Sequence, residues 1–262
     1  MLKEEQEFFH NISPKILKLI QDTQGSSHNF HQKGGDPLNY ATDTDIAIEK
    51  TVTEEINRRF PADKVYGEEL ASDYKLSKGR AWLMDPLCGT ANFARGFKTF
   101  STNIALAQGD KLIAACVIDH NRNNYVWSTG GGKIFINKKE TKPEITPGVK
   151  IDVDFGAFPL TDNVKAKEQC LKLVSKVSLE RDYTIWSLST TLSFAYVALG
   201  IFDAYVNVLS DKLHISAASF LVQESGGIVT DFSGNPWTLE SETLIVARDK
   251  KLHEELLGFL KS

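Results

Sequence analysis

Residues 82–93 read WLMDPLCGTANF, an apolar run that reaches an aspartate and then continues into a turn-forming segment. Asp85 ends the apolar strand, and Pro86 and then Gly89-Thr90 follow it, an order that holds the carboxylate rigidly. The amides after it can point at an anion, an arrangement that suits a divalent cation bridging carboxylates to a phosphate. On spacing alone, an ordinary acidic turn is the simpler interpretation, because acidic turns are common.

A second acidic segment, Gly67-Glu68-Glu69, also ends an apolar stretch. It supplies either further carboxylates for such a cation or only a solvated corner of the fold. By spacing alone, the solvated corner is again the simpler interpretation.

The first half of the chain combines two helical patterns with several short strand patterns. Apolar residues recur at helical spacing over 9–20, in a helix that Pro14 kinks or restarts. A second helix includes 48–56 and stops before Phe60-Pro61. Gly109-Asp110 fits a tight hairpin turn between two strands. Strands are expected at 81–84, 102–107, 112–118, 125–128 and 134–136.

The second half alternates strands and helices. Strands are expected at 151–155, 183–186, 204–208 and near Ile228 and Leu244. Helices are expected at 164–175, 190–199, 215–225 and in a last amphipathic segment that ends at Leu260. This order predicts an α/β or α+β fold built as a layered sandwich. We expect a single domain over 1–262, with subdomains 1–147 and 148–262 divided at the Lys-, Glu-, Thr- and Pro-rich stretch 138–149.

The composition excludes several classes of protein. The chain has 262 residues, with 30 basic and 34 acidic side chains and a net charge of −4, which argues against a nucleic-acid partner. Its charged N-terminal segment is neither a signal peptide nor a membrane span. Three scattered cysteines form neither a disulfide framework nor a paired metal motif, so a reducing, cytoplasmic location is expected.

Several segments together resemble one known family. The matching segments, in their order along nearly the whole chain, are Asp45 with Glu49, 67–69, 85–93, 195–198, 203–206, 213–218 with 224–227, and 245–247. This set resembles the inositol monophosphatase family, within the fructose-1,6-bisphosphatase/inositol phosphatase-like superfamily. The resemblance implies a layered αβαβα sandwich, magnesium-dependent hydrolysis of a small phosphorylated metabolite, and often a homodimer.

The resemblance also implies a first metal site. Glu68, Asp85 and the backbone carbonyl of Leu87 would hold Mg²⁺, and Thr90 would help Glu68 to orient the attacking water. Asp45 would support an additional, weaker metal through water. Concentrated positive charge of this kind is what phosphoryl transfer needs, more than a covalent nucleophile.

The substrate-binding residues follow from the same resemblance. The amides of Gly89, Thr90 and Ala91 would hold phosphate oxygens. Asn207 stands where the family commonly has a glutamate that contacts a substrate hydroxyl, and Leu188 stands where a glycine allows close approach. These two differences argue against inositol phosphate itself as the substrate.

Two metal-binding aspartates of the family are replaced in this chain. Cys88 stands where the family motif has its second aspartate, and His214 stands at the aspartate of the C-terminal motif. Both aspartates normally belong to a second metal site, and neither a thiol nor an imidazole is a natural ligand for Mg²⁺. Since losing one electrostatic stabiliser typically costs about two to three powers of ten in rate, two-metal hydrolysis should be severely weakened.

Asp85, Cys88 and His214 offer one carboxylate, one thiolate and one imidazole. Three such ligands suit Zn²⁺ with an open fourth position. In the alternative, Cys88 is a small neutral filler and His214 caps its helix. The sequence therefore leaves two functions open: a weak or altered phosphatase for an inositol, sugar or nucleotide monophosphate, and an inactive pseudophosphatase that binds a ligand or a protein.

Overall fold

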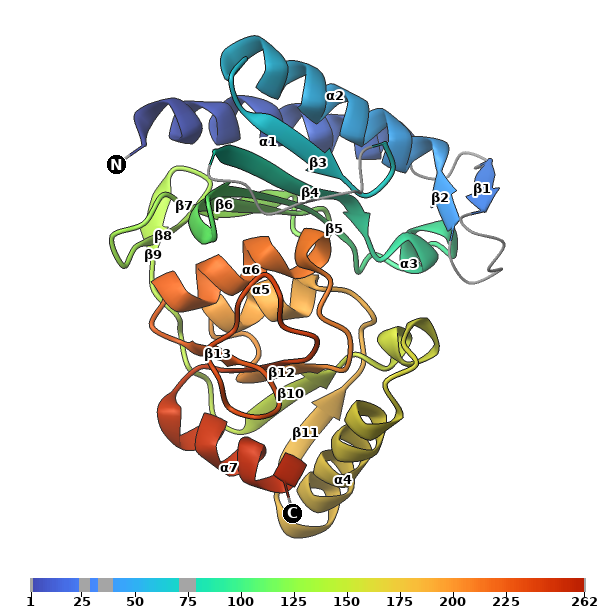
Figure 1. Ribbon diagram of the computed structural model, residues 1–262, viewed down its shortest axis with the longest axis vertical. Helices are drawn as coiled ribbons and strands as arrows, with labels where there is room; N and C mark the ends of the chain where they lie inside the picture. The colour runs from blue at the N-terminus through green and yellow to red at the C-terminus, as the bar shows by residue number, and fades with distance from the viewer. Residues whose placement is uncertain (1, 24–28, 33–39, 71–78, 262) are drawn as a thin grey trace.

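The computed structural model describes residues 2–23, 29–32, 40–70 and 79–261. Its elements stack in five alternating layers of helix and sheet, with α1 and α2 at one end and α4 and α7 at the other (Figure 1). The layered αβαβα sandwich expected from the sequence is therefore confirmed.

Seven α-helices and one 3-10 helix are described. They are α1 (Lys3–Thr23), α2 (Asp43–Arg59), α3 (Thr90–Ala94), η1 (Phe155–Leu160), α4 (Val164–Glu180), α5 (Leu192–Ala198), α6 (Lys212–Glu224) and α7 (Lys250–Lys261). Among these described helices, none combines the length and the apolar character needed to cross a membrane.

The described strands form two large sheets and one two-stranded ribbon. They are β1 (Phe30–Gln32), β2 (Tyr40–Thr42), β3 (Lys64–Gly67), β4 (Arg80–Cys88), β5 (Ser101–Gln108), β6 (Lys111–Asp119), β7 (Asn124–Ser128), β8 (Ile134–Ile136), β9 (Lys139–Thr141), β10 (Val149–Val153), β11 (Tyr183–Trp186), β12 (Ala204–Asn207), β13 (Ile228–Thr230) and β14 (Leu244–Ala247).

The larger sheet has the order β3-β4-β5-β6-β7-β8-β9, and it is antiparallel except for the β3–β4 pair. Both faces of β4 are covered: Trp82 and Met84 pack with α1 and α2, whereas Ala81 and Leu83 pack with α5 and α6. A strand buried on two faces has an almost continuous apolar sequence, which explains the run before Asp85.

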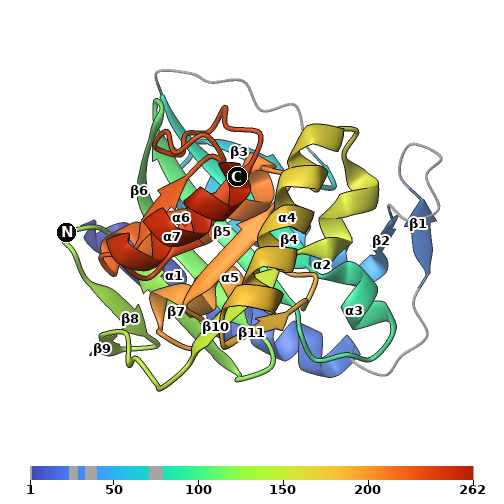
Figure 2. The same cartoon turned by 90° about the horizontal axis from the view of Figure 1, so that it is seen from below.

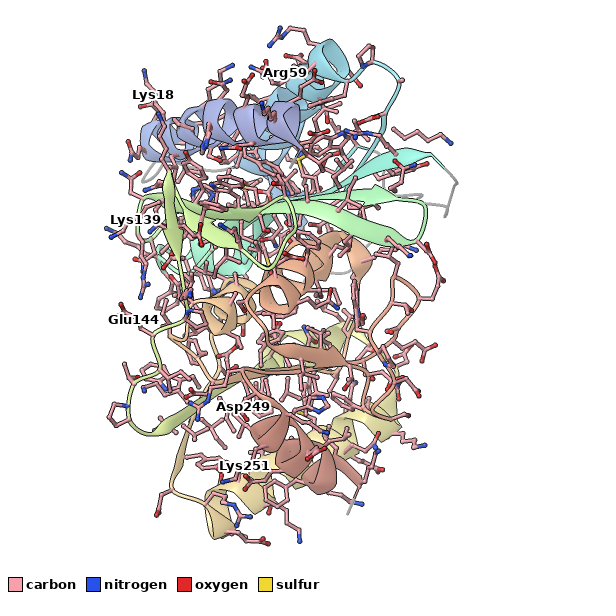
Figure 3. The ribbon with its side chains drawn as sticks, turned by 90° about the vertical axis from the view of Figure 1, so that its left-hand side faces the viewer. Lys18, Arg59, Lys139, Glu144, Asp249 and Lys251 are labelled. Carbon is pink, nitrogen blue, oxygen red and sulfur yellow. The ribbon has the colours of Figure 1, made fainter. Side chains whose placement is uncertain are left out.

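The smaller sheet has the order β11-β10-β12-β14-β13. Its strand β10 is parallel to both β11 and β12, whereas β14 is antiparallel to its two neighbours. Helices α5 and α6 lie on one side of this sheet and α4 and α7 on the other (Figure 2). Figure 3 shows charged side chains, among them Lys18 on α1 and Lys251 on α7, on the outer layers of the stack.

Some predicted boundaries were wrong for identifiable reasons. Helix α1 continues through Pro14, which lies on its exposed face, so the helix does not restart there. The stretch 138–149, expected as a connection only, contains β9. Helix α6 begins at Lys212 instead of Ile215, since the preceding Asp211 caps it.

The bend at the end of β4 positions the site. The register between β4 and β5 shifts between Asp85 and Cys88, so the strand is irregular where its polar side chains begin. Such irregularities re-aim side chains at the end of a strand. Gly89 then adopts a φ of 95° and starts α3, a conformation that favours glycine.

Candidate active site

Seven of the predicted site residues line a cavity of about 340 Å³: Glu68, Cys88, Gly89, Thr90, Ala91, Asn207 and His214. Asp45 and Leu87 contact the lining residue Thr90, and Asp85 contacts His214. The end of β4, the start of α3, the segment after β10, the segment 189–191 and the start of α6 line the cavity. Two larger grooves, of about 570 and 500 Å³, lie along 161–166 and 231–243 and contain none of the predicted site residues. The chemistry therefore belongs to the smaller cavity.

Asp85 is the fully buried carboxylate of this site. Its Oδ1 accepts a hydrogen bond from the Leu87 amide at 3.1 Å, and its Oδ2 lies 2.8 Å from His214 Nδ1, at ion-pair distance. Burial raises the pKa of Asp85, and the charge of His214 opposes this shift.

His214 faces two carboxylates. Its Nε2 lies 3.8 Å from Glu68 Oε2, in addition to the contact between Nδ1 and Asp85. Burial alone would lower the pKa of His214, but the charges of Glu68 and Asp85 raise it well above the ordinary value. The predicted capping role is wrong, because Asp211 accepts the Leu213 amide at 2.8 Å and His214 lies inside α6.

Cys88 is buried, and protein donors surround its thiol. Sγ accepts hydrogen bonds from the Thr191 amide at 3.2 Å and from the Thr191 hydroxyl at 2.9 Å. Burial also raises the pKa of this thiol. One ligand atom from each of Asp85, Cys88 and His214 lies within 4.8 Å of the others, so the structure brings together the three residues of the zinc hypothesis.

Thr90 is held by two acceptors. Its hydroxyl lies 2.9 Å from the Leu87 carbonyl and 3.0 Å from Asp45 Oδ1, and it can donate its single proton to either. The other oxygen of Asp45 accepts both the amide and the hydroxyl of Thr42, at 2.8 and 2.5 Å. Asp45 is completely buried, and its described side-chain contacts are to Thr42 and Thr90.

Glu49 supports the Glu68 turn from below. Its carboxylate accepts the amides of Glu69 and Leu70, each at 2.8 Å. A Cβ at Gly67 would lie 2.2 Å from this carboxyl group, so the close approach requires glycine. The sequence pattern pairs Glu49 with Asp45 without giving it a role, and the glycine before Glu68 is the signal that could have revealed its contact with this turn.

The predicted phosphate-binding amides lie at the start of α3. The first amides of a helix have no partners within the helix, and Gly89, Thr90 and Ala91 occupy this position and line the cavity. A Cβ at Gly89 would approach the Thr99 carbonyl to 2.9 Å. The Asn92 amide group donates to the Leu188 carbonyl at 2.7 Å and thereby connects this turn to the opposite wall.

Asn207, expected to bind substrate, lines the cavity and belongs to a hydrogen-bond network that the sequence did not reveal. Its amide group donates to the Tyr205 hydroxyl at 2.9 Å and lies 3.4 Å from Asp154 Oδ2. Asp154 follows strand β10 as Asp85 ends β4, and this shared position was the signal that could have revealed it.

A buried aspartate near the end of β4, with Glu68 and a glycine turn at a cavity of an αβαβα sandwich, is an arrangement typical of metal-dependent phosphoric monoester hydrolases. The sequence pattern of the inositol monophosphatase family matches residues 2–261, and the chain belongs to this family.

Known relatives agree with this assignment. The chain is 30% identical over 199 residues to the Nus factor SuhB of Xylella fastidiosa, a match that covers 75% of this chain and 70% of the relative. It is 26% identical over 237 residues to an inositol monophosphatase of Dictyostelium discoideum, covering 89% and 85% of the two chains.

Solved structures share the fold. The IMPase of Thermotoga maritima superposes with a TM-score of 0.83 at 23% identity, over 98% of this chain and 96% of that one. An IMPase/NADP phosphatase solved with NADP and Ca²⁺ has a TM-score of 0.83 at 18% identity, over 100% of this chain and 97% of that one. At these identities the likeness concerns the fold.

Proposed function

We propose that the chain hydrolyses a small phosphomonoester of the inositol, sugar or nucleotide class, slowly, with one divalent cation beside Asp85. The observation that carries this proposal is the meeting of two carboxylates at one position: Asp85 Oδ2 and Glu68 Oε2 lie 2.8 and 3.8 Å from the two ring nitrogens of His214, and their charges raise its pKa. Two carboxylates directed at one positive charge also suit a divalent cation, with the buried Asp85 Oδ2 among its ligands.

The donors around that oxygen fit one hard cation. Glu68, Asp85 and the Leu87 carbonyl offer oxygen ligands, which Mg²⁺ prefers. When bound there, the cation supplies positive charge to the phosphoryl group and lowers the pKa of a water molecule. Thr90, held between Leu87 and Asp45, keeps its hydroxyl oriented at this position. The amides of Gly89, Thr90 and Ala91, which line the cavity, would hold the phosphate oxygens.

The second metal position explains why we propose a slow reaction. Cys88 Sγ accepts two hydrogen bonds from Thr191. The ring of His214 contacts Asp85 Oδ2, an oxygen that a second cation would also need as a ligand. Neither side chain replaces the hard oxygen ligands of a magnesium site. Stabilisation of the leaving oxygen is therefore reduced.

The assay that tests this function measures phosphate release from a panel of inositol, sugar and nucleotide monophosphates with Mg²⁺. We expect turnover above background that falls about 100-fold or more in Asp85→Asn. Glu144→Gln, on the outer surface far from the cavity, is the matched control and should behave as wild type (Figure 3). Equal rates in wild type and Asp85→Asn would favour the inactive, ligand-binding alternative.

The convergence of Asp85, Cys88 and His214 supports Zn²⁺ as a second candidate for the bound metal. Elemental analysis of protein purified without chelators tests it. We expect that zinc, if it is the resident metal, is present in wild type and lost in Cys88→Ala, while Cys170→Ala, a buried cysteine elsewhere, retains it. A zinc-free wild type, or equal zinc in Cys88→Ala, would leave Mg²⁺ as the cation of the proposal.

A further inference from the structure

His120 follows the end of β6 and contacts β5 through a single polar atom. The residue is half-buried, and its ring stacks on Phe100 with the two ring centroids 5.3 Å apart. Nδ1 is closed to solvent and has no hydrogen-bond partner among the described residues. Nε2 lies 3.0 Å from the hydroxyl oxygen of Thr102 on β5. His120 therefore acts on the strand beside it through Nε2.

Thr102 fixes the direction of this hydrogen bond. Its fully buried hydroxyl donates its single proton to the Pro86 carbonyl at 2.7 Å, because a carbonyl oxygen only accepts. The same hydroxyl oxygen therefore accepts from His120 Nε2, which carries the ring proton. Burial lowers the pKa of His120 to about 3, so the ring is neutral and Nδ1 has no proton. A directed chain of hydrogen bonds thus runs from the His120 ring to the Pro86 carbonyl.

This chain ends at the bulge of β4. The register of β4 with β5 shifts between Asp85 and Cys88, so that Pro86 and Leu87 both face Thr102. A residue added to one strand in this way interrupts the ladder of backbone hydrogen bonds. The side chain of Thr102 supplies a hydrogen bond to the backbone at this interruption.

The peptide unit that Thr102 holds also orients the Asp85 carboxylate. The carbonyl of Pro86 and the N–H of Leu87 belong to one planar trans peptide, so their two bonds point in opposite directions. The carbonyl accepts from Thr102, and the N–H donates to Asp85 Oδ1 at 3.1 Å. Fixing one end of this peptide unit therefore fixes the donor at its other end.

We propose that His120 is a positioning residue for the cation site: through Thr102 it fixes the peptide between Pro86 and Leu87, and this peptide orients the Asp85 carboxylate. Neither His120 nor Thr102 is among the described residues that line the cavity, so the effect of His120 is indirect. This inference rests on the proposed function, because it takes a divalent cation to bind beside Asp85.

NMR of the metal-free full chain tests the direction of the chain of hydrogen bonds. The ¹⁵N signals of the His120 ring should show a proton on Nε2 and none on Nδ1. The carbonyl ¹³C signal of Pro86 should change in His120→Phe, which keeps an aromatic ring but has no N–H, and should move toward its value in Thr102→Val. His120→Gln, whose amide nitrogen can take the position of Nε2, should keep the wild-type signal. A proton on Nδ1 in wild type, or an unchanged Pro86 signal in folded His120→Phe, overturns the proposal.

Binding of Mn²⁺, measured by electron paramagnetic resonance of the free ion, tests the effect on the cation site. His120→Phe should raise the dissociation constant of Mn²⁺ about 3- to 10-fold, as expected when one orienting hydrogen bond is lost. His120→Gln should bind Mn²⁺ as wild type does. Thr102→Val should weaken Mn²⁺ binding, and His120→Phe added to it should cause no further loss, because His120 acts through Thr102.

His253→Phe is the matched control. His253 Nε2 lies 2.8 Å from the Thr230 hydroxyl, which donates to the Asp231 carbonyl at 2.9 Å. This arrangement has the same three groups, and none of its residues is among the described residues that line the cavity. His253→Phe should lower the free energy of unfolding but leave Mn²⁺ affinity and the Pro86 signal unchanged. An equal loss of Mn²⁺ affinity in His253→Phe would show a general effect of stability and overturn the positioning role.

The outcomes separate this inference from the proposed function. If wild type binds no Mn²⁺, the cation of the proposed function is overturned, and the Pro86 signal alone decides whether His120 holds the peptide. Unchanged Mn²⁺ affinity in His120→Phe, or a further loss when it is added to Thr102→Val, overturns the positioning role and leaves the cation standing. If His120→Phe does not fold, His120→Asn, whose shorter amide does not reach Thr102, takes its place in both measurements.

Discussion

The two walls of the cavity differ in how their carboxylates are satisfied. On the wall of α2 and β3, Asp45 and Glu49 are buried and each accepts hydrogen bonds from the protein through both oxygens. On the side of β10 and α6, Asp154 Oδ1 has no hydrogen-bond partner among the described residues, and Asp85 Oδ2, at the end of β4 between the walls, contacts the His214 ring at 2.8 Å. The carboxylates of the first wall are therefore saturated by protein donors, whereas those on the other side are not.

Cys88 and His214 lie on the side of the cavity where the carboxylates are not saturated by protein donors. Cys88 and His214 fill space near Asp85 that hard oxygen ligands would otherwise occupy, while the Thr90–Asp45 side is retained. Under the proposed function, the first cation position is therefore retained and the second is lost.

The largest expected effect comes from restoring that second position. The double variant Cys88→Asp with His214→Asp should raise kcat/KM for phosphomonoesters by about two to three powers of ten, because it returns two oxygen ligands. Steady-state kinetics with Mg²⁺ measures the change. The single variant Cys88→Ser, which adds no carboxylate, is the control and should stay near the wild-type rate. An unchanged rate in a folded double variant would show that the missing second cation position does not limit the reaction.

A smaller effect concerns Asp152, which is buried on the β10 side. Burial raises its pKa to about 7, so the folded protein disfavours the charged form. The protonated carboxyl therefore stabilises the fold fully at low pH, and this contribution is lost as the pH rises from about 4 through 7. We compare the unfolding free energy of Asp152→Asn with that of wild type at each pH. From pH 4.5 to pH 8, this difference should shift in favour of the variant by about 2 to 4 kcal/mol, because only wild type loses stability.

Urea unfolding of wild type and Asp152→Asn at the two pH values measures this shift. Asp182→Asn, a surface carboxylate between α4 and β11, is the control and should show no comparable change. A constant difference between wild type and Asp152→Asn at both pH values would contradict the raised pKa.

The smallest expected effect concerns the contact that holds the Cys88 thiol. Thr191→Val removes the hydroxyl that donates to Sγ and accepts from the Asn103 amide at 2.7 Å. Thermal or urea unfolding should show a loss of about 1 to 2 kcal/mol, since two hydrogen bonds of a buried group disappear. Thr191→Ser keeps the hydroxyl and should lose less. Equal losses in the two variants would mean that the methyl group, and not the thiol contact, matters.

The sequence predicted those helices and strands in which apolar residues recur regularly over many positions. The helices α1, α2, α4 and α7 and the long strands of the larger sheet were expected from apolar spacing. The three-residue strands β1 and β2 and the five-residue helix α3 were not, because such short elements depend on tertiary contacts and leave little periodicity.

The candidate site could be predicted where its residues lie close together in the sequence. Asp85, Leu87, Cys88 and Thr90 lie in one continuous segment, so a motif reveals them. The contact of Thr191 with Cys88 joins residues 103 positions apart, and the unpaired oxygen of Asp154 depends on which way Tyr205 and Asn207 donate. No local pattern encodes such directions.

Strand β4 has a consequence for how the protein unfolds. Its residues belong alternately to the core under α1 and α2 and to the core around α5 and α6, so one strand ties two cores into a single cooperative unit. The amides of β4 should therefore exchange with solvent only through global opening of the chain. The Asp85 carboxylate is thus placed at the end of the segment that is the last to open.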